Sequence, residues 1–596
     1  MHSTDGQPVS FDTDAGRRVY RHTASHIMAH AVKRLYPDAK LAIGPATDEG
    51  FYYDFDTDKP FAADDIKKIE EEMDRIIKEG LPIERLEMSR SDALAYARGR
   101  GEIYKAELIE ELPIDTVISF YRQGDFTDLC AGPHLINTKL VKAFALTSDA
   151  GSTGAYWRGS EKNKMLSRIY GTAFDKKADL DAYLTMREEA KKRDHNKLGR
   201  ELKLFATDSL LGQGLPLLMP KGSKIIQILQ RFVEDEEEKR GYLLTKTPFF
   251  AKSDLYKVSG HWDHYKDGMF IIGDEAKDDE VLALRPMTCP FQFSIYKAEQ
   301  HSYRDLPIRY NETSPLFRNE ASGEMHGLIR VRQFTLSEGH LVCTKEQLAD
   351  EFKGVIELIN YFLDTLGLSG DVKYRFSKWD PNDRGKYIGD ESVWEETQDN
   401  MRVLLDGLGF DYTEADGEAA FYGPKLDLQF KNVYGKEDTI ITVQIDFSLA
   451  ERFNMTYIDA DGSKKYPIII HRSSIGCYER TLALLIEKYA GAFPVWLCPA
   501  QAIVLPISDK VAGYAAAVLN KLKAAGVRAE ADMRPEKISF KIREAKLDKI
   551  PYLLVVGEKE AEDGTVSVRS RAGDEGAIDI DAFIGRVVEE DKLKKL

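Results

Sequence analysis

The stretch that decides the fold is Phe317-Arg318-Asn319-Glu320, followed after a short polar turn by His326-Gly327-Leu328-Ile329-Arg330-Val331-Arg332-Gln333-Phe334. Alternate residues of an extended strand share one face, so Arg318 and Glu320 are expected on one side of a first strand. Arg330 and Arg332 are expected on a second, antiparallel strand. Guanidinium groups bind phosphate oxygens bidentately, and a carboxylate accepts from an amino group. The pattern predicts a nucleotide site on a hairpin; a surface hairpin with ordinary ion pairs is the alternative.

The composition predicts a soluble globular protein of several domains. At 596 residues the chain is long enough for roughly three or four domains. It has no apolar run near the ~20 residues of a spanning helix and no secretory signal. Five widely spaced cysteines indicate a reducing compartment, so we expect a cytoplasmic protein without membrane contact. The net charge of −16 argues against non-specific coating of nucleic acid but leaves local basic patches open.

Periodicity along the chain divides it into four segments. Helices are expected over 17–35 and over 64–79, where Ile66, Ile69, Met73, Ile76 and Ile77 share one face. A highly charged segment with few apolar positions predicts a single helix that links two domains. The chain then alternates β-rich runs with a few amphipathic helices, which indicates one large antiparallel sheet. After Pro494, alternating strands and helices predict a compact α/β domain. The expected segments are 1–178, 179–200 as the linker helix, 201–494 and 495–596.

Two clusters of soft ligands lie far apart in the sequence. His22 and His26 share one helix face, and FTDLCAGPH supplies Cys130 and His134, with Asp128 close by. This cluster is compatible with a zinc site, with a hydrolytic pocket or with a plain polar helix face. His30, one helical step further, is expected at the pocket rim or in solvent.

The second cluster comprises Cys289 in MTCP, His340 in SEGH and His471 in IIIHRS. Their spacing matches no short zinc motif. If the three did converge, a fourth metal position would stay open for a substrate.

FRNE and RVRQF, joined to RPMTCP and HRSSIGCYERTLALLIE, resemble the core of the class II aminoacyl-tRNA synthetases. With RHTASHIMAH, FTDLCAGPH and RDHNKLGRELKLF added, the chain resembles the bacterial threonyl-tRNA synthetase family from about residue 17 to near its C-terminus. The resemblance implies an α+β multidomain protein with an α+β editing domain and a class II antiparallel sheet of six or seven strands flanked by helices. A C-terminal α/β anticodon-binding domain would follow. GYLLTKTP, ending at Pro248, looks like the first motif, which serves homodimerisation.

The implied activity is threonine–tRNA ligation, in which ATP and Mg²⁺ activate L-threonine as an adenylate that is transferred to the 3′ end of threonine tRNA. Arg318 would hold the α-phosphate, Glu320 and Phe334 the adenine, and Arg330 and Arg480 the outer phosphates. The threonine pocket would be lined by Tyr422, Lys425 and Gln444, and His261 resembles the base of the transfer step. Arg318, His261, Arg480 and Lys425 are therefore the implied catalytic set.

In this family one zinc per subunit selects the amino acid, and the matching ligands are Cys289, His340 and His471. Threonine can present an amine and a hydroxyl to zinc, whereas valine lacks the hydroxyl. Serine lacks only a methyl group, a difference worth about 1–3 kcal/mol, so mischarged seryl-tRNA must be hydrolysed elsewhere. The resemblance assigns this editing role to the first cluster and implies no structural zinc there. The matching residues are His22, His26, Lys105, Asp128, Cys130 and His134.

The C-terminal domain is implied to read the anticodon. Segment 534–549 holds six basic and three acidic residues, which suits phosphate contacts. The expected anticodon residues are Arg543, Glu560 and Arg569; a solvated helix face is the alternative for the basic segment alone.

The chain departs from the family pattern at several positions. Only about 16 residues precede the first helix, so we expect the small N-terminal ubiquitin-like domain of many members to be absent. Where bacterial members commonly have Gln-Asp-Asp-Ala-His, this chain has Leu336-Ser337-Glu338-Gly339-His340. The zinc ligand His340 keeps its register, while the contacts to threonine must differ at Leu336 and Glu338. Cys477 stands where serine is frequent.

Two other functions remain open. Another class II synthetase, such as a prolyl or glycyl enzyme, would share the core but not the Cys289/His340/His471 set. An RNA-binding regulator without catalysis would not need Arg318, Glu320, Arg330 and Arg480 together.

Overall fold

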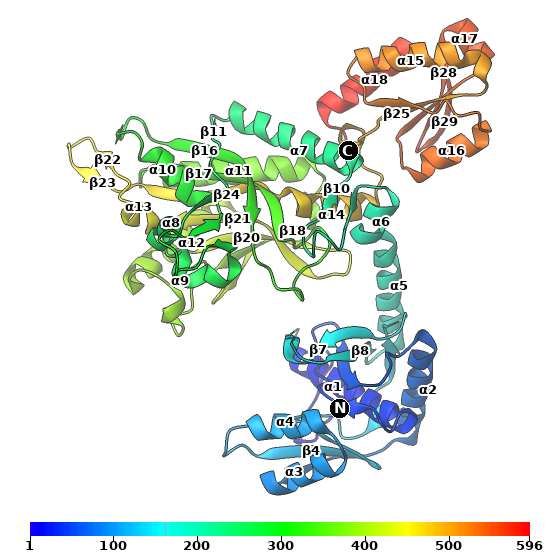
Figure 1. Cartoon of the computed structure of the whole chain (residues 1–596), viewed down its shortest axis with the longest axis vertical. Helices are drawn as coiled ribbons and strands as arrows, with labels where there is room; N and C mark the ends of the chain where they lie inside the picture. The colour runs from blue at the N-terminus through cyan, green and yellow to red at the C-terminus, as the bar shows by residue number, and fades with distance from the viewer. Residues whose placement is uncertain (149, 161, 410) are drawn as a thin grey trace. The chain divides into compact units, whose positions relative to one another are not determined.

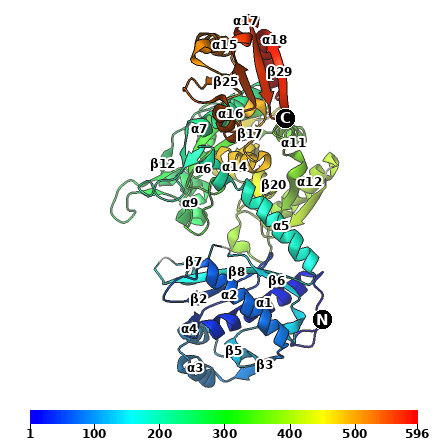
Figure 2. The same cartoon turned by 90° about the vertical axis from the view of Figure 1, so that its right-hand side faces the viewer.

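The computed structural model describes residues 1–148, 150–160, 162–409 and 411–596, and it divides into two compact units, Met1–Glu188 and Glu189–Leu596 (Figures 1 and 2). Within the described residues, no helix is both long enough and apolar enough to cross a bilayer.

The first unit is organised around helix α1 (Asp14–Leu35), most of whose residues are buried. The Thr13 side chain caps it by accepting from the Gly16 amide. Helix α1 lies beside α2 (Ala63–Glu79), as Figure 2 shows, and packs on β2 and β8. The helices predicted over 17–35 and 64–79 are confirmed, and Ile66, Ile69, Met73 and Ile76 are buried as expected. The sheet has the order β1-β2-β8-β6, with β7 also on β8; its strands are Lys40–Leu41, Phe51–Asp56, Met165–Phe174, Ala143–Leu146 and Thr153–Tyr156.

A smaller sheet in the same unit has the antiparallel order β3 (Ile83–Met88), β4 (Ile118–Gln123), β5 (Phe126–Leu129). Helices α3 (Arg90–Gly99) and α4 (Ile103–Glu111) pack on it through a small apolar cluster. The Cys-Ala-Gly-Pro-His segment begins directly after β5, so the sheet fixes the position of Cys130.

The charged segment after residue 176 forms two helices rather than the single linker helix expected over 179–200. Helix α5 (Lys177–Arg193) ends before Asp194, and α6 (His195–Glu201) begins after it. The Asp194 carboxylate accepts from the Asn196 and Lys197 amides, so this residue is an N-cap and starts a new helix. Asp194 is a typical N-cap residue, but in a segment with so many charged residues it does not stand out as the start of a new helix.

The second unit contains a large sheet of eight strands, counted over residues 189–409 and 411–596, in the order β11-β16-β17-β24-β21-β20-β18-β19. The expected sheet of six or seven antiparallel strands is therefore too small, and the end pairs β11·β16 and β18·β19 are parallel. The strands in that order are Leu243–Leu244, Ile308–Phe317, Gln333–Cys343, Ile468–Cys477, Glu437–Asp446, Lys425–Lys431, Val372–Ser377 and Tyr412–Ala415.

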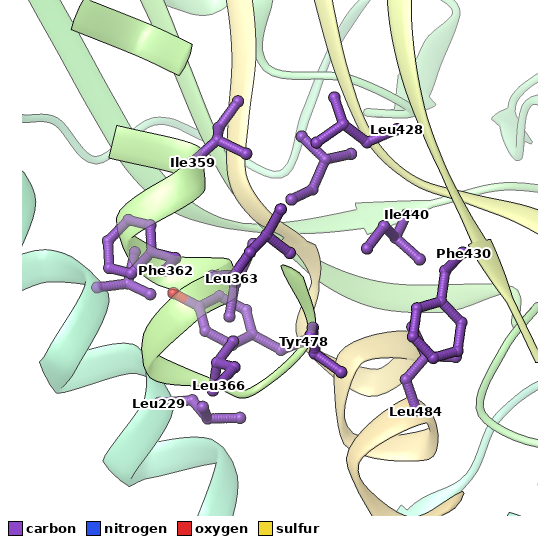
Figure 3. Packing of buried hydrophobic residues seen from close by; sticks show 14 of the residues in the cluster. Leu229, Ile359, Phe362, Leu363, Leu366, Leu428, Phe430, Ile440, Tyr478 and Leu484 are labelled. Atoms are coloured by element: carbon purple, nitrogen blue, oxygen red, sulfur yellow. The ribbon is translucent and has the colours of Figure 1, made fainter. Parts of the chain in front are cut away.

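Three amphipathic helices cover this sheet: α7 (Pro220–Lys239), α11 (Leu348–Thr365) and α14 (Tyr478–Tyr489). Figure 3 shows the core between them, where Leu229, Phe362 and Leu484 come from the three helices and Leu428 and Phe430 from β20. Burial of this apolar surface holds the sheet rigid beneath the cavity described below. The other helices of the core segment are α8 (Ser253–Ser259), α9 (His261–Tyr265), α10 (Cys289–Tyr296), α12 (Glu391–Leu408) and α13 (Leu449–Arg452). Its short strands are β9 (Phe205–Ala206), β10 (Leu217–Leu218), β12 (Phe250–Lys252), β13 (Ile271–Ile272), β14 (Leu282–Leu284), β15 (His301–Ser302), β22 (Tyr457–Ile458) and β23 (Lys464–Lys465).

The C-terminal segment folds around a sheet whose order in residues 501–596 is β26-β25-β27-β28-β29. The alternation of strands and helices predicted after Pro494 is confirmed for β25 (Ala502–Pro506), α15 (Ala512–Ala524), β26 (Ala529–Ala531), α16 (Ile538–Leu547), β27 (Tyr552–Val556) and β28 (Thr565–Ser570). Three further elements were not predicted: α17 (Glu558–Asp563), β29 (Gly573–Asp579) and α18 (Ile580–Leu593). Strand β29 is mostly exposed, so it carries no apolar alternation that would reveal it.

Candidate functional site

A cavity of about 300 Å³ in the second unit gathers most of the residues predicted from the two ATP motifs and the second ligand cluster. Its walls come from β17, β21 and β24, from the ends of α10 and α14, and from the loop between β16 and β17. The predicted residues that line it are Cys289, Arg318, Glu320, Arg330, Phe334, Tyr422, Gln444, His471 and Arg480.

The arginines and the glutamate of the ATP motifs lie in the hairpin loop, not on the strands where the alternation placed them. The β16–β17 ladder ends at the pair Phe317 and Gln333, so Arg318, Glu320 and Arg330 all fall beyond it. The expected strand positions are wrong because the chain turns away from the ladder there. Their convergence does not depend on strand alternation, since the loop directs all three into the cavity.

Ion pairs organise this loop. Arg330 donates to Glu320 at 2.8 Å and to Glu324 at 2.9 Å. The Arg318 guanidinium carbon lies 5.2 Å from the centroid of the Phe334 ring. A cationic fork above an aromatic face is an arrangement that can hold a phosphate beside a stacked base.

Arg480, near the start of α14, also reaches the loop. Its Nε donates to the Ile329 carbonyl at 2.9 Å, and its Nη1 donates to the Thr439 carbonyl. The guanidinium is therefore held in place by two main-chain oxygens while it lines the cavity.

Only some of the residues predicted to bind threonine or to act in the transfer step line the cavity. The Tyr422 hydroxyl donates to Gln444 Oε1, and both line the cavity. Lys425 lies outside the lining and forms an ion pair with Asp427 at 3.0 Å. His261 also lies outside it, with its ring 6.1 Å from that of Tyr422 and its Nδ1 2.8 Å from the Ser259 hydroxyl. Burial lowers the pKa of His261 to about 3, so its imidazole is neutral at physiological pH.

Cys289, His340 and His471 converge despite their distance in sequence. Their ligand atoms lie within 4.8 Å of one another, and all three residues are buried. The register brings His340 of β17 directly opposite His471 of β24, while Cys289 is the first residue of α10.

The hydrogen bonds of this set fit a divalent metal. His471 Nε2 lies 2.9 Å from Asp446 Oδ2, which leaves Nδ1 for a ligand role. The Gln292 side-chain oxygen accepts from His340 Nδ1, and His340 Nε2 has no hydrogen-bond partner among the described residues. Such an orphaned, fully buried nitrogen beside a thiol is the arrangement expected of zinc ligands whose outer partners fix the tautomer.

Gln292 is a further residue of this set, and the sequence pattern did not predict it. It is fully buried, and its Nε2 donates to the Thr245 hydroxyl at 2.7 Å while its oxygen binds His340. The available signal was its position three residues after Cys289, which places both on one face of α10.

The departures from the family pattern lie in the cavity wall. Glu338 is buried, accepts from the Thr288 amide at 3.2 Å, and lies 3.7 Å from His340 Nε2. Burial raises the pKa of its carboxyl. Leu336 packs with Leu316, Val331 and Phe334 instead of offering a polar group. Cys477 donates to Glu479 at 3.2 Å, and it is not among the residues whose ligand atoms converge, which are Cys289, His340 and His471.

The first ligand cluster also assembles, in the first unit. Cys130 Sγ lies 3.2 Å from His22 Nε2 and 3.2 Å from His134 Nε2, and it accepts from the Gly132 amide at 3.3 Å. Gly132 has φ +66, and a Cβ there would overlap the Tyr121 hydroxyl, which explains the glycine. His22, Cys130 and Lys105 line an open cavity of about 970 Å³.

Burial keeps the histidines and the thiol of this cluster uncharged. It lowers the pKa of His22 to about 4 and that of His26 to about 3, and it raises the pKa of the Cys130 thiol to about 11. Behind the cavity, His26 and His134 have ring centroids 4.8 Å apart. Lys105 forms a buried ion pair with Asp128 at 2.9 Å. All six predicted residues therefore lie in one region of the unit.

His30 was placed wrongly at the pocket rim or in solvent. It is buried, its Nδ1 accepts from Gln123 at 2.8 Å, and its Nε2 lies 3.0 Å from Asp125. Its ring stacks on Phe126. With Arg34 Nε also 3.0 Å from Nε2, three polar partners and a stacked ring make His30 a structural residue of the fold.

The three anticodon candidates are separate in the C-terminal segment. Arg543 is exposed on α16, Glu560 caps α17 by accepting from the Gly557 amide at 2.8 Å, and Arg569 of β28 pairs with Asp574 at 3.3 Å. Over the described residues, no hydrogen bond or ion pair joins any two of them.

Comparison with known proteins gives three family matches. Residues 270–489 match the class II tRNA synthetase core domain (G, H, P, S and T), residues 501–590 an anticodon-binding domain, and residues 118–170 the threonyl and alanyl tRNA synthetase second additional domain.

Relatives and solved structures agree with these matches. The chain is 66% identical over 582 residues to the threonine–tRNA ligase of Clostridium perfringens, covering 98% of this chain and 90% of the relative. It is 50% identical to that of Acetivibrio thermocellus, covering 98% and 91%. The structure of the RNA-binding domain of threonyl-tRNA synthetase from Cryptosporidium parvum aligns with a TM-score of 0.63 at 34% identity, covering 66% of this chain and 98% of the other. The chain belongs to the threonine–tRNA ligase family, with a class II synthetase core, an anticodon-binding domain and the second additional domain.

Proposed function

We propose that this protein charges threonine tRNA with L-threonine at the expense of ATP and removes serine attached in error. The observation that carries the proposal is the single cavity in which Arg318, Arg330 and Arg480 lie next to the Cys289/His340/His471 set. A triphosphate and a small amino acid can then be held side by side. A prolyl or glycyl enzyme would have no use for the ligand set, and an RNA-binding regulator would have none for the arginines.

In the activation step, a threonine carboxylate oxygen attacks the α-phosphorus of ATP, the bond from that phosphorus to the oxygen bridging to the β-phosphate breaks, and pyrophosphate leaves. Mg²⁺, when bound to ATP, would offset the negative charge of the phosphates. Arg318 is proposed to bind the α-phosphate, where negative charge develops, and Arg330 and Arg480 the outer phosphates. The Phe334 face and Glu320 would hold adenine. For Glu320 and Arg330 this requires exchange of their mutual ion pair for contacts with the nucleotide.

One zinc ion per subunit is proposed at Cys289, His340 and His471, whose outer partners are Gln292 and Asp446. When bound, zinc would act as a Lewis acid toward the amine and hydroxyl of threonine. Tyr422 and Gln444 line the same cavity and would orient the amino acid. Glu338 would face the substrate hydroxyl where the commoner family pattern has aspartate. Lys425 is a weaker threonine contact because Asp427 already holds it.

For the transfer step, the neutral imidazole of His261 is proposed to accept the proton of the attacking tRNA hydroxyl. The C-terminal segment would position the tRNA, with Arg543, Glu560 and Arg569 near the anticodon; for Glu560 the capping bond to α17 competes with that role.

Editing is proposed at the first-unit cluster, because His22, Lys105 and Cys130 all line its open cavity. His22 is unprotonated at neutral pH and can accept a proton from water as it attacks the seryl ester. His26, Asp128 and His134 would hold the catalytic groups in place. We propose that Cys130 acts here as a neutral thiol and not as a zinc ligand, because a zinc ion bound to the neighbouring His22 Nε2 would occupy the lone pair that must accept the proton from water.

A homodimer is proposed through the first motif. Strand β11 is an edge of the large sheet, and Leu243, Leu244, Phe249 and Phe250 are between 44% and 66% exposed. Exposed apolar residues on a sheet edge favour pairing with a second chain. We also propose a cytoplasmic location, which suits five cysteines that form no disulfide within the described chain.

The test is a set of aminoacylation assays with purified protein. Wild type should attach threonine to threonine tRNA, and His22→Ala or Cys130→Ala should let seryl-tRNA accumulate while threonine activation stays intact. Unchanged serine mischarging in both variants would refute the editing assignment, and no charging with threonine would refute the proposed function.

A further inference from the structure

His195 is a buried histidine that the proposed reaction does not use. It is the first residue of α6, and its side chain is 0% exposed. Its Nδ1 lies 2.7 Å from the Glu487 carboxylate of α14. On the other side of the ring, the Leu328 amide donates to Nε2 at 3.3 Å.

These two bonds define the state of the ring. Because Nε2 accepts from a main-chain N–H, its lone pair is engaged and the proton must be on Nδ1, which donates to Glu487. His195 lies close to Asp194 and Glu487 in an arrangement that could in principle hold a metal. With no free lone pair on the ring, and with Asp194 engaged as the cap of α6, a metal role is excluded by the contacts themselves.

Leu328 belongs to the loop that carries the ATP residues, here defined as residues 326–332. Its neighbours Ile329 and Arg330 line the cavity. Arg480 donates to the Ile329 carbonyl, so the loop is held at two successive residues, by His195 at Leu328 and by Arg480 at Ile329.

Both contacts that hold the loop depend on helix α14. Arg480 and Glu487 are seven residues apart on α14, about two turns, so they lie on the same face. Glu487 anchors His195, and Arg480 reaches the loop directly. Helix α14 therefore fixes the loop through one direct contact and one contact relayed by His195.

Gly327 gives independent support for close contact between the loop and His195. It has φ +49, and a Cβ built there would overlap both His195 Nε2 and the Asn196 side-chain oxygen. The main chain can approach His195 this closely only at glycine.

We propose that His195 is a positioning residue for the ATP-binding loop: as a neutral Nδ1–H tautomer anchored by Glu487, it holds the Leu328 amide and so sets where Arg330 meets the nucleotide. This inference rests on the proposed function for its meaning in catalysis. Its physical content, a preorganised nucleotide loop, concerns ATP binding alone.

The test compares His195→Ala, His195→Asn and His195→Gln in the intact chain, with Gly327→Ala as an independent perturbation of the same contact. His195→Asn keeps a donor for Glu487 but is too short to reach Leu328, whereas His195→Gln keeps a donor and an acceptor on a longer side chain. We expect His195→Ala, His195→Asn and Gly327→Ala to weaken ATP binding about tenfold, and His195→Gln to restore part of that loss. The probes are ATP in titration calorimetry, and KM for ATP and for threonine in pyrophosphate exchange.

A purely structural role predicts another result: a lower melting temperature with equal changes in both KM values. That result, or unaltered ATP affinity in all four variants, would overturn the proposal. The double variant His195→Ala/Gly327→Ala should lose less than the product of the two single losses, because both act at one contact; a full product would also contradict it. If wild type binds ATP but exchanges no pyrophosphate with threonine, the proposed function fails while the ATP affinities still decide the role of His195.

Discussion

Replacement of Gln292 by leucine tests the metal site without touching a ligand. Gln292 is fully buried, accepts from His340 Nδ1 and donates to Thr245 Oγ1. Leucine fills a similar volume, so the change removes two hydrogen bonds without leaving a large cavity. The His340 N–H then has no acceptor, and its ring loses the tautomer and orientation that leave Nε2 free for a metal. Removing a residue that hydrogen-bonds to a metal ligand reduces metal affinity about 10- to 100-fold.

The cost to folding is separate and can be measured separately. The His340 N–H left buried and unpaired costs about 1–3 kcal/mol, whereas the Thr245 hydroxyl keeps its hydrogen bond to the Asn311 carbonyl; Gln292→Leu should therefore lower the free energy of unfolding by roughly 1–3 kcal/mol. Zinc affinity is measured by competition with a chromophoric chelator at a temperature where both proteins are folded. Gln292→Glu is the matched control, since its carboxylate still accepts from His340 Nδ1 and should retain most of the affinity. Zinc affinity within about twofold of wild type in Gln292→Leu would refute the role of Gln292.

Three further outcomes are expected. Cys289→Ser should lose about one zinc per chain, measured by metal analysis, and with it threonine activation; a full zinc count in an active variant would exclude Cys289 as a ligand. The folded-state pKa values of His22 and His26, about 4 and 3, lie below the ordinary 6.5, so the stability tied to their neutral forms is complete above pH 6.5 and declines as the pH falls toward 4. Each histidine should contribute a slope of about 1.4 kcal/mol per pH unit, and His26→Asn should remove one such slope from denaturant titrations at pH 4.5–6.5; identical slopes would refute the assignment. Leu243→Asp with Leu244→Asp should yield monomers in analytical ultracentrifugation if β11 is the dimer edge, and an unchanged sedimentation coefficient would place the interface elsewhere.

The sequence predicted correctly which residues lie close together, but it was less successful in predicting which secondary-structure elements carry them. Arg318, Glu320 and Arg330 do converge on one cavity, but from a loop, because the strand ladder ends at Phe317 and alternation beyond that point has no structural meaning. The large sheet was predicted from apolar runs, whereas its parallel edge strands are too short to be seen in that pattern.

Other features depend on contacts between residues far apart in sequence, which no local pattern contains. His30 follows the i, i+4 series of His22 and His26, yet Gln123 and Asp125 convert it into a buried structural residue. No sequence motif assigns a chemical role to Gln292 or His195. Their roles follow from partners 48 and 133 residues away, at His340 and Leu328.

The most direct test of the central assignment is ATP–pyrophosphate exchange across amino acids, run on one preparation with a zinc count. The cavity that joins three arginines to the Cys289/His340/His471 set predicts exchange with threonine, weak exchange with serine, none with valine, and one zinc per chain. Equal exchange with valine, or full activity in metal-free protein, would contradict the account.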